Sequence, residues 1–203
     1  KDTSGLLVVA KNEKAHEKLG AALAARRVER RYALISWGHL GEGERRIDAP
    51  LARNPADRKR MAIVAGGRAA VTRVYTVVRG GVADLAVAKL ETGRTHQIRV
   101  HLQSIGHPVA GDPVYGSGSH KRSDATRAEA ERLEHALPRQ ALHAASLAFR
   151  HPRTGVWLSL RSEWPADLRQ GLAIALRDSD LLAHPQPLEY LGVFLPGGTR
   201  ERT

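Results

Sequence analysis

The sequence contains no cysteine, and this absence removes several classes of site. Without thiolates there is no disulfide, no nucleophilic cysteine and no Cys-ligated zinc or iron–sulfur cluster. No apolar run approaches the roughly 20 residues that a membrane-spanning helix needs, and no signal peptide is visible. We therefore expect a cytoplasmic protein with no membrane partner.

Aromatic residues and methionine are also scarce. Nine aromatic residues in 203 are too few for the interleaved aromatics of an RNA-recognition motif. No GxSxG, Walker or GxGxxG motif occurs, so no nucleotide cofactor is expected. The only methionine is Met61. Lys1 is therefore not a translation start, and we expect residues to precede it.

Positive charge is the most prominent feature that the sequence does have. Lysine and arginine total 32 against 21 acidic residues, which gives a net charge of +11, and 25 of the 32 are arginines. The planar guanidinium binds phosphate through two hydrogen bonds and stacks on bases. A basic, Arg-rich chain favours a nucleic-acid partner. The alternative is an Arg-rich surface that reflects a GC-rich genome.

Segments with strand and helix patterns alternate along the chain. Runs rich in apolar or β-branched residues predict strands at 5–10, 28–37, 61–64, 71–78, 82–90, 144–150 and 156–161. Helical spacing follows the possible cap Asn12 and recurs at 95–105, 124–136 and 165–176. Strand pairs joined by tight turns predict an α+β fold with a mostly antiparallel sheet. We expect one domain over 1–182 and a flexible tail, rich in Pro, Gly and charge, over 183–203.

The stretch 92–116 has the highest density of chemically active side chains. A metal site would use His96, His101 and His107, but the first two lie about 140° apart on a helix. No carboxylate sits at ligand spacing either, so we expect no metal. Arg94, Arg99 and the N–H groups of a helix capped by Thr95 predict an anion-binding corner instead. The alternative is a pair of ordinary solvated arginines.

A second basic cluster leads into a strand that contains an aromatic residue. Its arginines are candidates for RNA contact: Arg26, Arg27, Arg30 and Arg31. Tyr32 follows directly and shares a strand face with Leu34, whereas Ala33 belongs to the other face. Tyr32 is suited to stacking on a base. The alternative is a tyrosine of the core.

Four stretches in this order resemble the RluA-like branch of RNA pseudouridine synthases. Lys1–Lys11 resembles the second half of the family signature, and Arg31-Tyr32-Ala33-Leu34 resembles its tyrosine motif. Residues 92–116 resemble its arginine motif and the loop that follows it. Residues 139–144, RQALHA, with 149–152, FRHP, resemble its C-terminal stretches. The resemblance covers residues 1 to about 176.

The resemblance implies a fold, a reaction and a partner. The fold would be an antiparallel-rich mixed sheet flanked by helices and loops. The reaction would convert uridine to pseudouridine in ribosomal RNA or tRNA, without a cofactor or metal. An Asp carboxylate attacks the uridine, the N-glycosidic bond breaks, the base turns and a C–C bond forms. The target nucleotide must leave its stack, which a basic and aromatic surface favours.

The resemblance also assigns roles to individual residues. The family nucleophile ends an Arg-Leu-Asp triplet that would come immediately before Lys1, so we expect it upstream of this sequence. Asp2, two residues later, is the substitute within the chain. Tyr32 matches the tyrosine that stacks on the target base and assists removal of the C5 proton. Arg99 matches the arginine that pairs with the nucleophile, while Arg94 and His96 are candidates for RNA contact.

Two other classes of protein remain open. One is a non-catalytic RNA-binding relative or fragment that lacks the nucleophile. The other is an unrelated structural protein of the ribosome, which would not be expected to contain the four stretches in this order. An Arg-Leu-Asp triplet encoded before Lys1 would favour the enzyme over the non-catalytic relative. The sequence does not indicate which uridine is modified or whether an S4-like domain precedes the chain.

Overall fold

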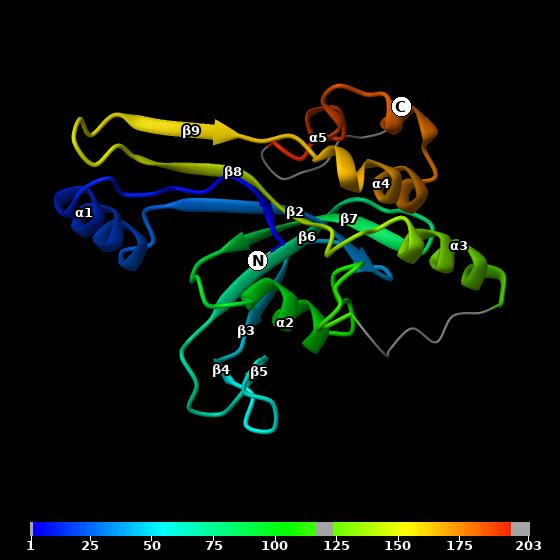
Figure 1. Ribbon diagram of the computed structural model, residues 1–203, viewed down its shortest axis with the longest axis horizontal. Helices are drawn as coiled ribbons and strands as arrows, with labels where there is room; N and C mark the ends of the chain where they lie inside the picture. Colours follow the sequence, from blue (N-terminus) through cyan, green and yellow to red (C-terminus); the bar gives the residue numbers. More distant parts are fainter. Residues whose placement is uncertain (1, 117–123, 196–203) are drawn as a thin grey trace.

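The protein is built on one seven-stranded sheet with helices on both faces. The computed structural model describes residues 2–116 and 124–195 (Figure 1). The sheet has the strand order β1-β8-β2-β7-β6-β3, with β9 also paired to β8. Only β1 and β8 run parallel, and the other pairs are antiparallel. The predicted α+β fold with an antiparallel-rich mixed sheet is confirmed.

The strands of the main sheet span most of the described chain. They are β1 (Ser4–Gly5), β2 (Glu29–Trp37), β3 (Arg45–Asp48), β6 (Val71–Val78), β7 (Ala83–Leu90), β8 (Leu142–Arg150) and β9 (Trp157–Arg161). A separate two-stranded sheet joins β4 (Leu51–Arg53) to β5 (Met61–Ile63). The hairpin predicted at Gly80-Gly81 connects β6 to β7, where the backbone N–H of Gly80 donates to Asp84. The second predicted hairpin connects β8 to β9.

The helices divide between the two faces of the sheet. They are α1 (Glu13–Ala24), α2 (Gln97–Ser104), α3 (Asp124–His135), α4 (Arg169–Leu176) and α5 (Pro187–Tyr190), with short 3-10 turns at Ala166–Leu168 and Ser179–Leu182. Asn12 caps α1 as predicted, because its Oδ1 accepts a hydrogen bond from the N–H of Ala15 at 2.9 Å. None of the helices in the two described ranges is both long and apolar enough to cross a bilayer.

Successive side chains of β2 point alternately into two separate hydrophobic cores. Ala33, Ile35 and Trp37 join the cluster that α3, α4 and the C-terminal segment cover. Leu34 and Tyr32 belong to the cluster on the opposite face, where α2 packs through Ile98 and Leu102. The predicted division of β2 into two faces is therefore confirmed, and it assigns Tyr32 to the face of α2.

The strand predicted over 5–10 is mostly wrong. Only Ser4–Gly5 form a strand, and Leu7 and Val9 are 84% and 73% exposed. Strand β8 limits the length of β1. Its outer edge pairs with β1 at His143 and Ala144 and with β9 from Ser146 onward, so no free edge remains for a longer β1.

The C-terminal segment also differs from the predicted flexible tail. From residue 183 to 195 the chain contains α5 and buries Leu188, Leu191 and Val193 in the core on the face of α3 and α4. Apolar residues spaced among prolines and glycines account for this packing. Residues 117–123 and residues 196–203 of the predicted tail lie outside the described residues.

Candidate active site

Helix α2 is held against the sheet by a chain of buried hydrogen bonds. Nε2 of Gln97 donates to Oγ1 of Thr72 at 3.0 Å and to the carbonyl of Val71 at 2.9 Å. His101 lies 2.9 Å from the same hydroxyl through Nδ1 and 3.0 Å from the carbonyl of Ala49 through Nε2. The hydroxyl therefore donates to Nδ1, and Nε2–H donates to Ala49. Burial lowers the pKa of His101, which agrees with this neutral form.

The start of α2 differs from the prediction. Thr95 is exposed and is not the N-cap; His96 takes that position in a left-handed conformation, with φ 56°. Oε1 of Gln97 accepts hydrogen bonds from the N–H of Arg94 at 3.0 Å and from the hydroxyl of Thr92 at 2.8 Å. The Gln97 side chain thus closes the turn that the sequence assigned to Thr95.

Arg99 points from α2 to the loop that follows the helix. Its Nε and Nη2 donate to Oδ2 and Oδ1 of Asp112 at 2.6 and 2.7 Å. Both side chains are almost fully buried, with 7% and 0% exposed. Burial opposes ionisation of Asp112, but the Arg99 bonds and the backbone N–H groups of Val114 and Tyr115 outweigh it and hold its pKa below the usual range. The pair fixes the turn over 112–115 against α2.

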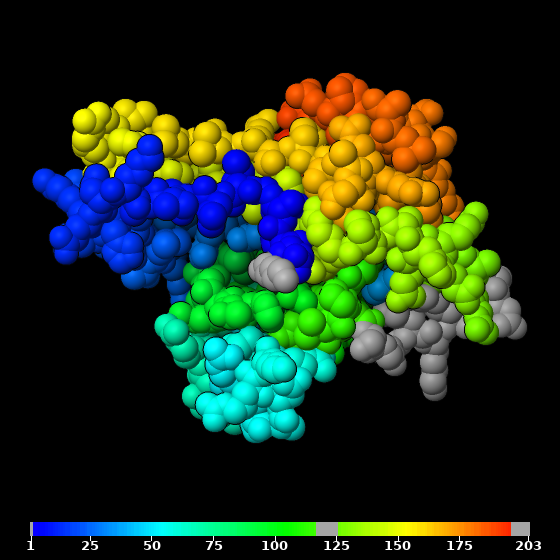
Figure 2. All heavy atoms as spheres, viewed as in Figure 1, coloured from blue at the N-terminus to red at the C-terminus, as the bar shows by residue number. Residues whose placement is uncertain are grey.

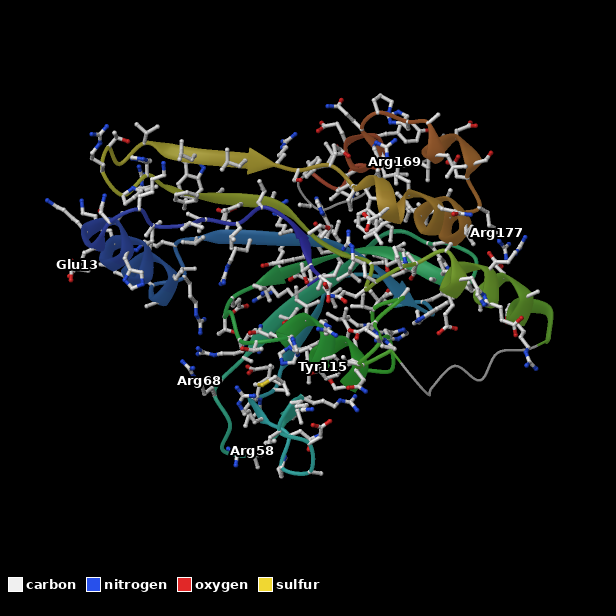
Figure 3. All side chains as sticks on the ribbon, viewed as in Figure 1. Glu13, Arg58, Arg68, Tyr115, Arg169 and Arg177 are labelled. Carbon is white, nitrogen blue, oxygen red and sulfur yellow. The ribbon has the colours of Figure 1, made fainter. Side chains whose placement is uncertain are left out.

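Tyr115 is the centre of this turn and was not singled out from the sequence. It is 2% exposed, and its hydroxyl accepts from the N–H of Met61 and lies 2.9 Å from Nδ1 of His96. The guanidinium of Arg99 lies 4.8 Å from its ring centroid, and Figure 3 shows Tyr115 beside α2. Only the tyrosine of the loop GDPVYG could have indicated it. Burial, followed by the charge of Arg99, lowers the pKa of His96.

Tyr32 lies on the same face of the sheet as α2. It pairs with Ala144 of β8 and with Ala88 of β7, and Ala144 in turn pairs with Gly5 of β1. Gly5 is therefore two strands away from Tyr32 in one row of the sheet, at about 10 Å. Burial raises the pKa of Tyr32, and the charge of Arg30 partly opposes this shift. Gly5 of the N-terminal segment and Tyr32 thus lie in one row of the sheet, and α2 packs on the face to which Tyr32 belongs.

Arg30 is the arginine of the basic cluster nearest to Tyr32 along the same face of β2. Its Nε is buried and lacks a hydrogen-bond partner among the described residues. Burial lowers the pKa of Arg30, since a desolvated guanidinium holds its proton less strongly. The loop residue Gly93 lies directly against its Nη1. This arrangement presents a partly desolvated cation next to Tyr32.

The other candidate arginines point in different directions. Arg26 pairs with Glu91 at 3.2 Å, and Arg27 is exposed. Arg31 is half-buried and its charge acts on Tyr75, which places it on the face opposite Tyr32. Arg94 donates through Nε to the carbonyl of Ala69 at 3.1 Å. The basic cluster therefore does not form one continuous surface.

The three histidines of the metal alternative do not meet. His96 contacts Tyr115, His101 contacts Ala49 and Thr72, and Nδ1 of His107 lies 3.0 Å from the carbonyl of Trp37. Within residues 2–116 and 124–195, no group of three His, Asp or Glu side chains could hold a metal ion.

Asp2, the substitute nucleophile, lies at the N-terminal end of the described chain. It is exposed and has a left-handed backbone with φ 66°. Its carbonyl oxygen accepts a hydrogen bond from Nη1 of Arg139 at 3.0 Å. Figure 2 shows the blue N-terminal segment on the surface of the molecule, running up to the green atoms. The backbone of Asp2, rather than its carboxylate, makes the anchoring contact.

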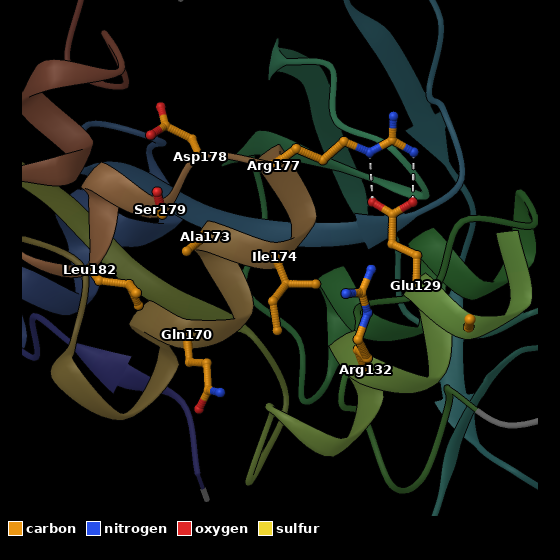
Figure 4. A pocket seen from close by; sticks show the side chains of 10 residues that line it. Glu129, Arg132, Gln170, Ala173, Ile174, Arg177, Asp178, Ser179 and Leu182 are labelled. Atoms are coloured by element: carbon orange, nitrogen blue, oxygen red, sulfur yellow. Dashed lines mark hydrogen bonds and ion pairs between the residues drawn. The ribbon is translucent and has the colours of Figure 1, made fainter.

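A pocket far from these residues lies between α3 and α4 (Figure 4). Arg177 and Glu129 close one side of it through a bidentate ion pair, in which Nε and Nη2 of Arg177 donate to Oε1 and Oε2 of Glu129 at 2.9 and 2.6 Å. None of the candidate site residues lines this pocket. Its other walls are formed by apolar and polar side chains of α4 and of the turn after it, such as Ile174 and Leu182.

Comparison with known proteins decides the family. The profile described as RNA pseudouridylate synthase matches residues 1–104, which is half of the chain and includes Tyr32 and Arg99. The chain belongs to the RNA pseudouridylate synthase family. The predicted family is confirmed, whereas the roles of individual residues remain predictions.

Curated relatives and solved structures agree with this assignment. The chain is 47% identical over 178 residues to "Ribosomal large subunit pseudouridine synthase D" of Zymomonas mobilis, covering 83% of this chain and 52% of the relative. The protein of the same name from Pseudomonas aeruginosa is 43% identical over 180 residues, covering 89% and 56%. The chain thus spans about half the length of these synthases. Human RNA Pseudouridylate Synthase Domain Containing 1 superposes with a TM-score of 0.66 at 28% identity, covering 91% of this chain and 78% of that one.

Proposed function

We propose that the protein isomerises specific uridines in RNA to pseudouridine, with ribosomal RNA as the main substrate and tRNA as a second class. The nucleophile is an Asp encoded immediately before Lys1, so the sequence as printed lacks it. No cofactor or metal takes part. Membership of the pseudouridylate synthase family supports the reaction, and the name shared by the two bacterial relatives supports ribosomal RNA.

The observation that carries this proposal is that the N-terminal segment joins the sheet in the row of Tyr32, on whose face α2 packs. Gly5, Ala144 and Tyr32 occupy one row across β1, β8 and β2. Helix α2, which bears Arg99, packs on that same face. A nucleophile five residues before Gly5 is within about 17 Å of it along an extended chain. A base that enters beside Tyr32 would thus meet groups from all three segments.

Each group has a defined part in the proposed reaction. The upstream carboxylate attacks the uridine and the bond between N1 and C1′ breaks. The base turns, C5 bonds to C1′ and the carboxylate is released, the C5 proton leaves and N1 takes up a proton, so the reaction is a pure isomerisation. Tyr32 stacks on the base and assists removal of the C5 proton. Arg99 keeps the nucleophile ionised by its positive charge.

Arg99 acts in a different geometry from the one that the sequence suggests. Its Nε and Nη2 already bind Asp112, so Nη1 is the arm that would face the nucleophile. Arg30, Arg94 and His96 contact the phosphates or the flanking nucleotides, and the other three arginines of the basic cluster contribute long-range attraction.

The test compares two forms of the protein on transcribed ribosomal RNA. One form is the 203-residue chain, and the other includes the residues encoded upstream of Lys1. Pseudouridine is mapped chemically after incubation. We expect product from the extended form and none from the printed chain. Equal activity of the two would show that the nucleophile lies inside the chain, with Asp2 the first residue to replace.

A further inference from the structure

Arg139 connects the N-terminal segment to the rest of the molecule. Its Nη1 donates to the carbonyl of Asp2 at 3.0 Å, and its Nη2 donates to Oγ of Ser4 at 3.2 Å. Its Nε and Nη2 also bind the carboxylate of Asp167 at 2.7 and 2.9 Å. The Arg139 side chain is 19% exposed. One planar group therefore holds residues from two distant parts of the chain in fixed relation.

The backbone of Arg139 reaches the other half of the candidate site. Gly111, with φ +70°, packs so closely on the carbonyl of Arg139 that a Cβ there would collide with it. The next residue, Asp112, binds Arg99. A hydrogen bond of 2.8 Å from the N–H of Ala141 to the carbonyl of Ala110 joins the same two segments. Asp2 and Arg99 are thus linked through Arg139, Gly111 and Asp112.

Backbone pairing fixes the chain from Ser4 onward. Gly5, with φ +101°, lies against the backbone of Ala144, and the N–H of Leu6 donates to the carbonyl of Ala144 at 3.0 Å. Oγ of Ser4 lies 2.9 Å from Nδ1 of His143. Asp2 lies outside this ladder, and Arg139 contacts it directly. The direction in which the chain enters β1 therefore depends on Arg139.

We propose that Arg139, oriented by Asp167, is a positioning residue that sets where the chain upstream of Ser4 lies relative to Arg99. This inference rests on the proposed function, in which the nucleophile precedes Lys1. Arginine suits the role because its rigid fork serves four acceptors at once. Lysine carries a single ammonium group and cannot reproduce this geometry.

The burial of the Arg139 guanidinium and the number of its contacts distinguish it from the arginine of an ordinary surface ion pair, while its partner Asp167 is 46% exposed. Arg161 and Glu189 also form a pair, at 3.1 Å, but their side chains are 52% and 49% exposed. Exposed pairs of this kind hold their geometry weakly. Arg161→Gln is therefore a matched control for Arg139→Gln, since each change removes one guanidinium from one ion pair.

The first experiment does not depend on activity. Amide hydrogen exchange is measured on the 203-residue chain for the wild type, Arg139→Gln, Arg139→Lys and Arg161→Gln. We expect exchange at Leu6 to rise about tenfold in both Arg139 variants, while the amides of β7 stay protected and Arg161→Gln matches the wild type. Wild-type exchange at Leu6 in Arg139→Gln would overturn the proposal.

The second experiment uses the chain that includes the upstream residues. Single-turnover rates are measured from pH 5 to 8, together with RNA affinity. We expect Arg139→Gln to lower the rate about 100-fold with affinity nearly unchanged, because a displaced nucleophile misses its attack geometry. The acid limb of its profile should move to higher pH, since a carboxylate farther from Arg99 has a higher pKa. A structural role alone would leave that limb in place.

The outcomes separate this inference from the proposed function. If the wild-type extended chain makes no pseudouridine, the proposed function fails, and the exchange data still judge whether Arg139 holds the segment. If the wild type is active and Arg139→Gln has the same rate and the same acid limb, the positioning role alone fails. Arg139→Lys should behave like Arg139→Gln, and full rescue by lysine would contradict the need for the planar fork.

Discussion

Arg99 presents both Nε and Nη2 to the buried carboxylate of Asp112, although the two residues lie on opposite sides of the turn that ends α2. The fork is therefore occupied before any substrate or nucleophile arrives. The pair ties the helix to the turn of Tyr115, whose ring lies 4.8 Å from the guanidinium. Arg99 thus has a part in stability as well as its proposed part in catalysis.

Removing Arg99 should destabilise the fold strongly. Arg99→Met leaves the buried charge of Asp112 with only backbone donors, and we expect a loss of about 3–5 kcal/mol in the free energy of unfolding. Urea denaturation followed by circular dichroism measures it. Arg161→Met, in an exposed pair, serves as the control and should cost less than about 1 kcal/mol. A similar small loss for both variants would contradict the structural part of this assignment.

The free energy of unfolding should fall as the pH drops below the ordinary pKa of His101. Burial lowers the pKa of His101 from 6.5 in the folded protein. Below about pH 6.5 the unfolded chain therefore binds a proton at this histidine that the folded chain does not bind. The free energy of unfolding falls as the pH drops from about 6.5 to the lowered pKa of His101 in the folded protein. Urea midpoints between pH 8 and 5 should decline less steeply in His101→Gln than in the wild type. The exposed residue His16 provides the control, since His16→Gln should keep the wild-type slope.

The hydroxyl and the ring of Tyr32 should have separable effects. In the chain with the upstream residues, Tyr32→Phe keeps stacking and loses the group that assists proton removal, so turnover should fall about 100-fold or more with RNA affinity retained. Tyr32→Ala should also weaken binding, by about 1–3 kcal/mol. Single-turnover kinetics and filter binding measure the two effects.

Tyr75 offers a matched control on the opposite face of the sheet. Its hydroxyl is buried and has no hydrogen-bond partner among the described residues. Tyr75→Phe should therefore keep wild-type turnover. A large loss for Tyr75→Phe, or none for Tyr32→Phe, would mean that the base enters elsewhere.

RNA affinity should depend strongly on salt, with a measurable share from Arg30. Each phosphate neutralised on a single strand contributes about −0.7 to the slope of log K against log salt. If the partly desolvated Arg30 binds one phosphate, Arg30→Met should reduce the slope by about that amount. Arg177→Met, which alters an arginine paired with Glu129 beside a distant pocket, should leave the slope unchanged. Equal slopes for wild type and Arg30→Met would remove Arg30 from the RNA contact.

The sequence predicted most of the sheet, because its strands carry strong local signals. β-Branched residues mark β6, an apolar run marks β7, Gly80-Gly81 marks their turn, and alternation along β2 assigned Tyr32 and Ala33 to opposite faces. The prediction failed for 5–10, where the strand stops at Gly5 and Leu7 and Val9 remain exposed, because β9 occupies the outer edge of β8 from Ser146 onward. No local pattern reports which edge of a distant strand is already taken.

The candidate site was predictable by residue type but not by partner. The density of charge in 92–116 indicated Arg99, yet nothing local shows that Asp112 binds its fork, because the turn between them brings the two together only in the folded state. Arg139 was noticed only as part of a motif. Its contacts join residues 137 and 28 positions away, which no spacing rule could supply.

Release of tritium from RNA labelled at C5 of uridine tests the central claim most directly, since the C5 proton leaves only when C5 bonds to C1′. The chain with its upstream residues is incubated with labelled ribosomal RNA, beside a variant in which the Asp encoded just before Lys1 is replaced by Asn. Because we propose that this Asp is the nucleophile, we expect steady release by the first protein and none by the second. Release by the Asn variant at the rate of the unaltered chain would contradict the account.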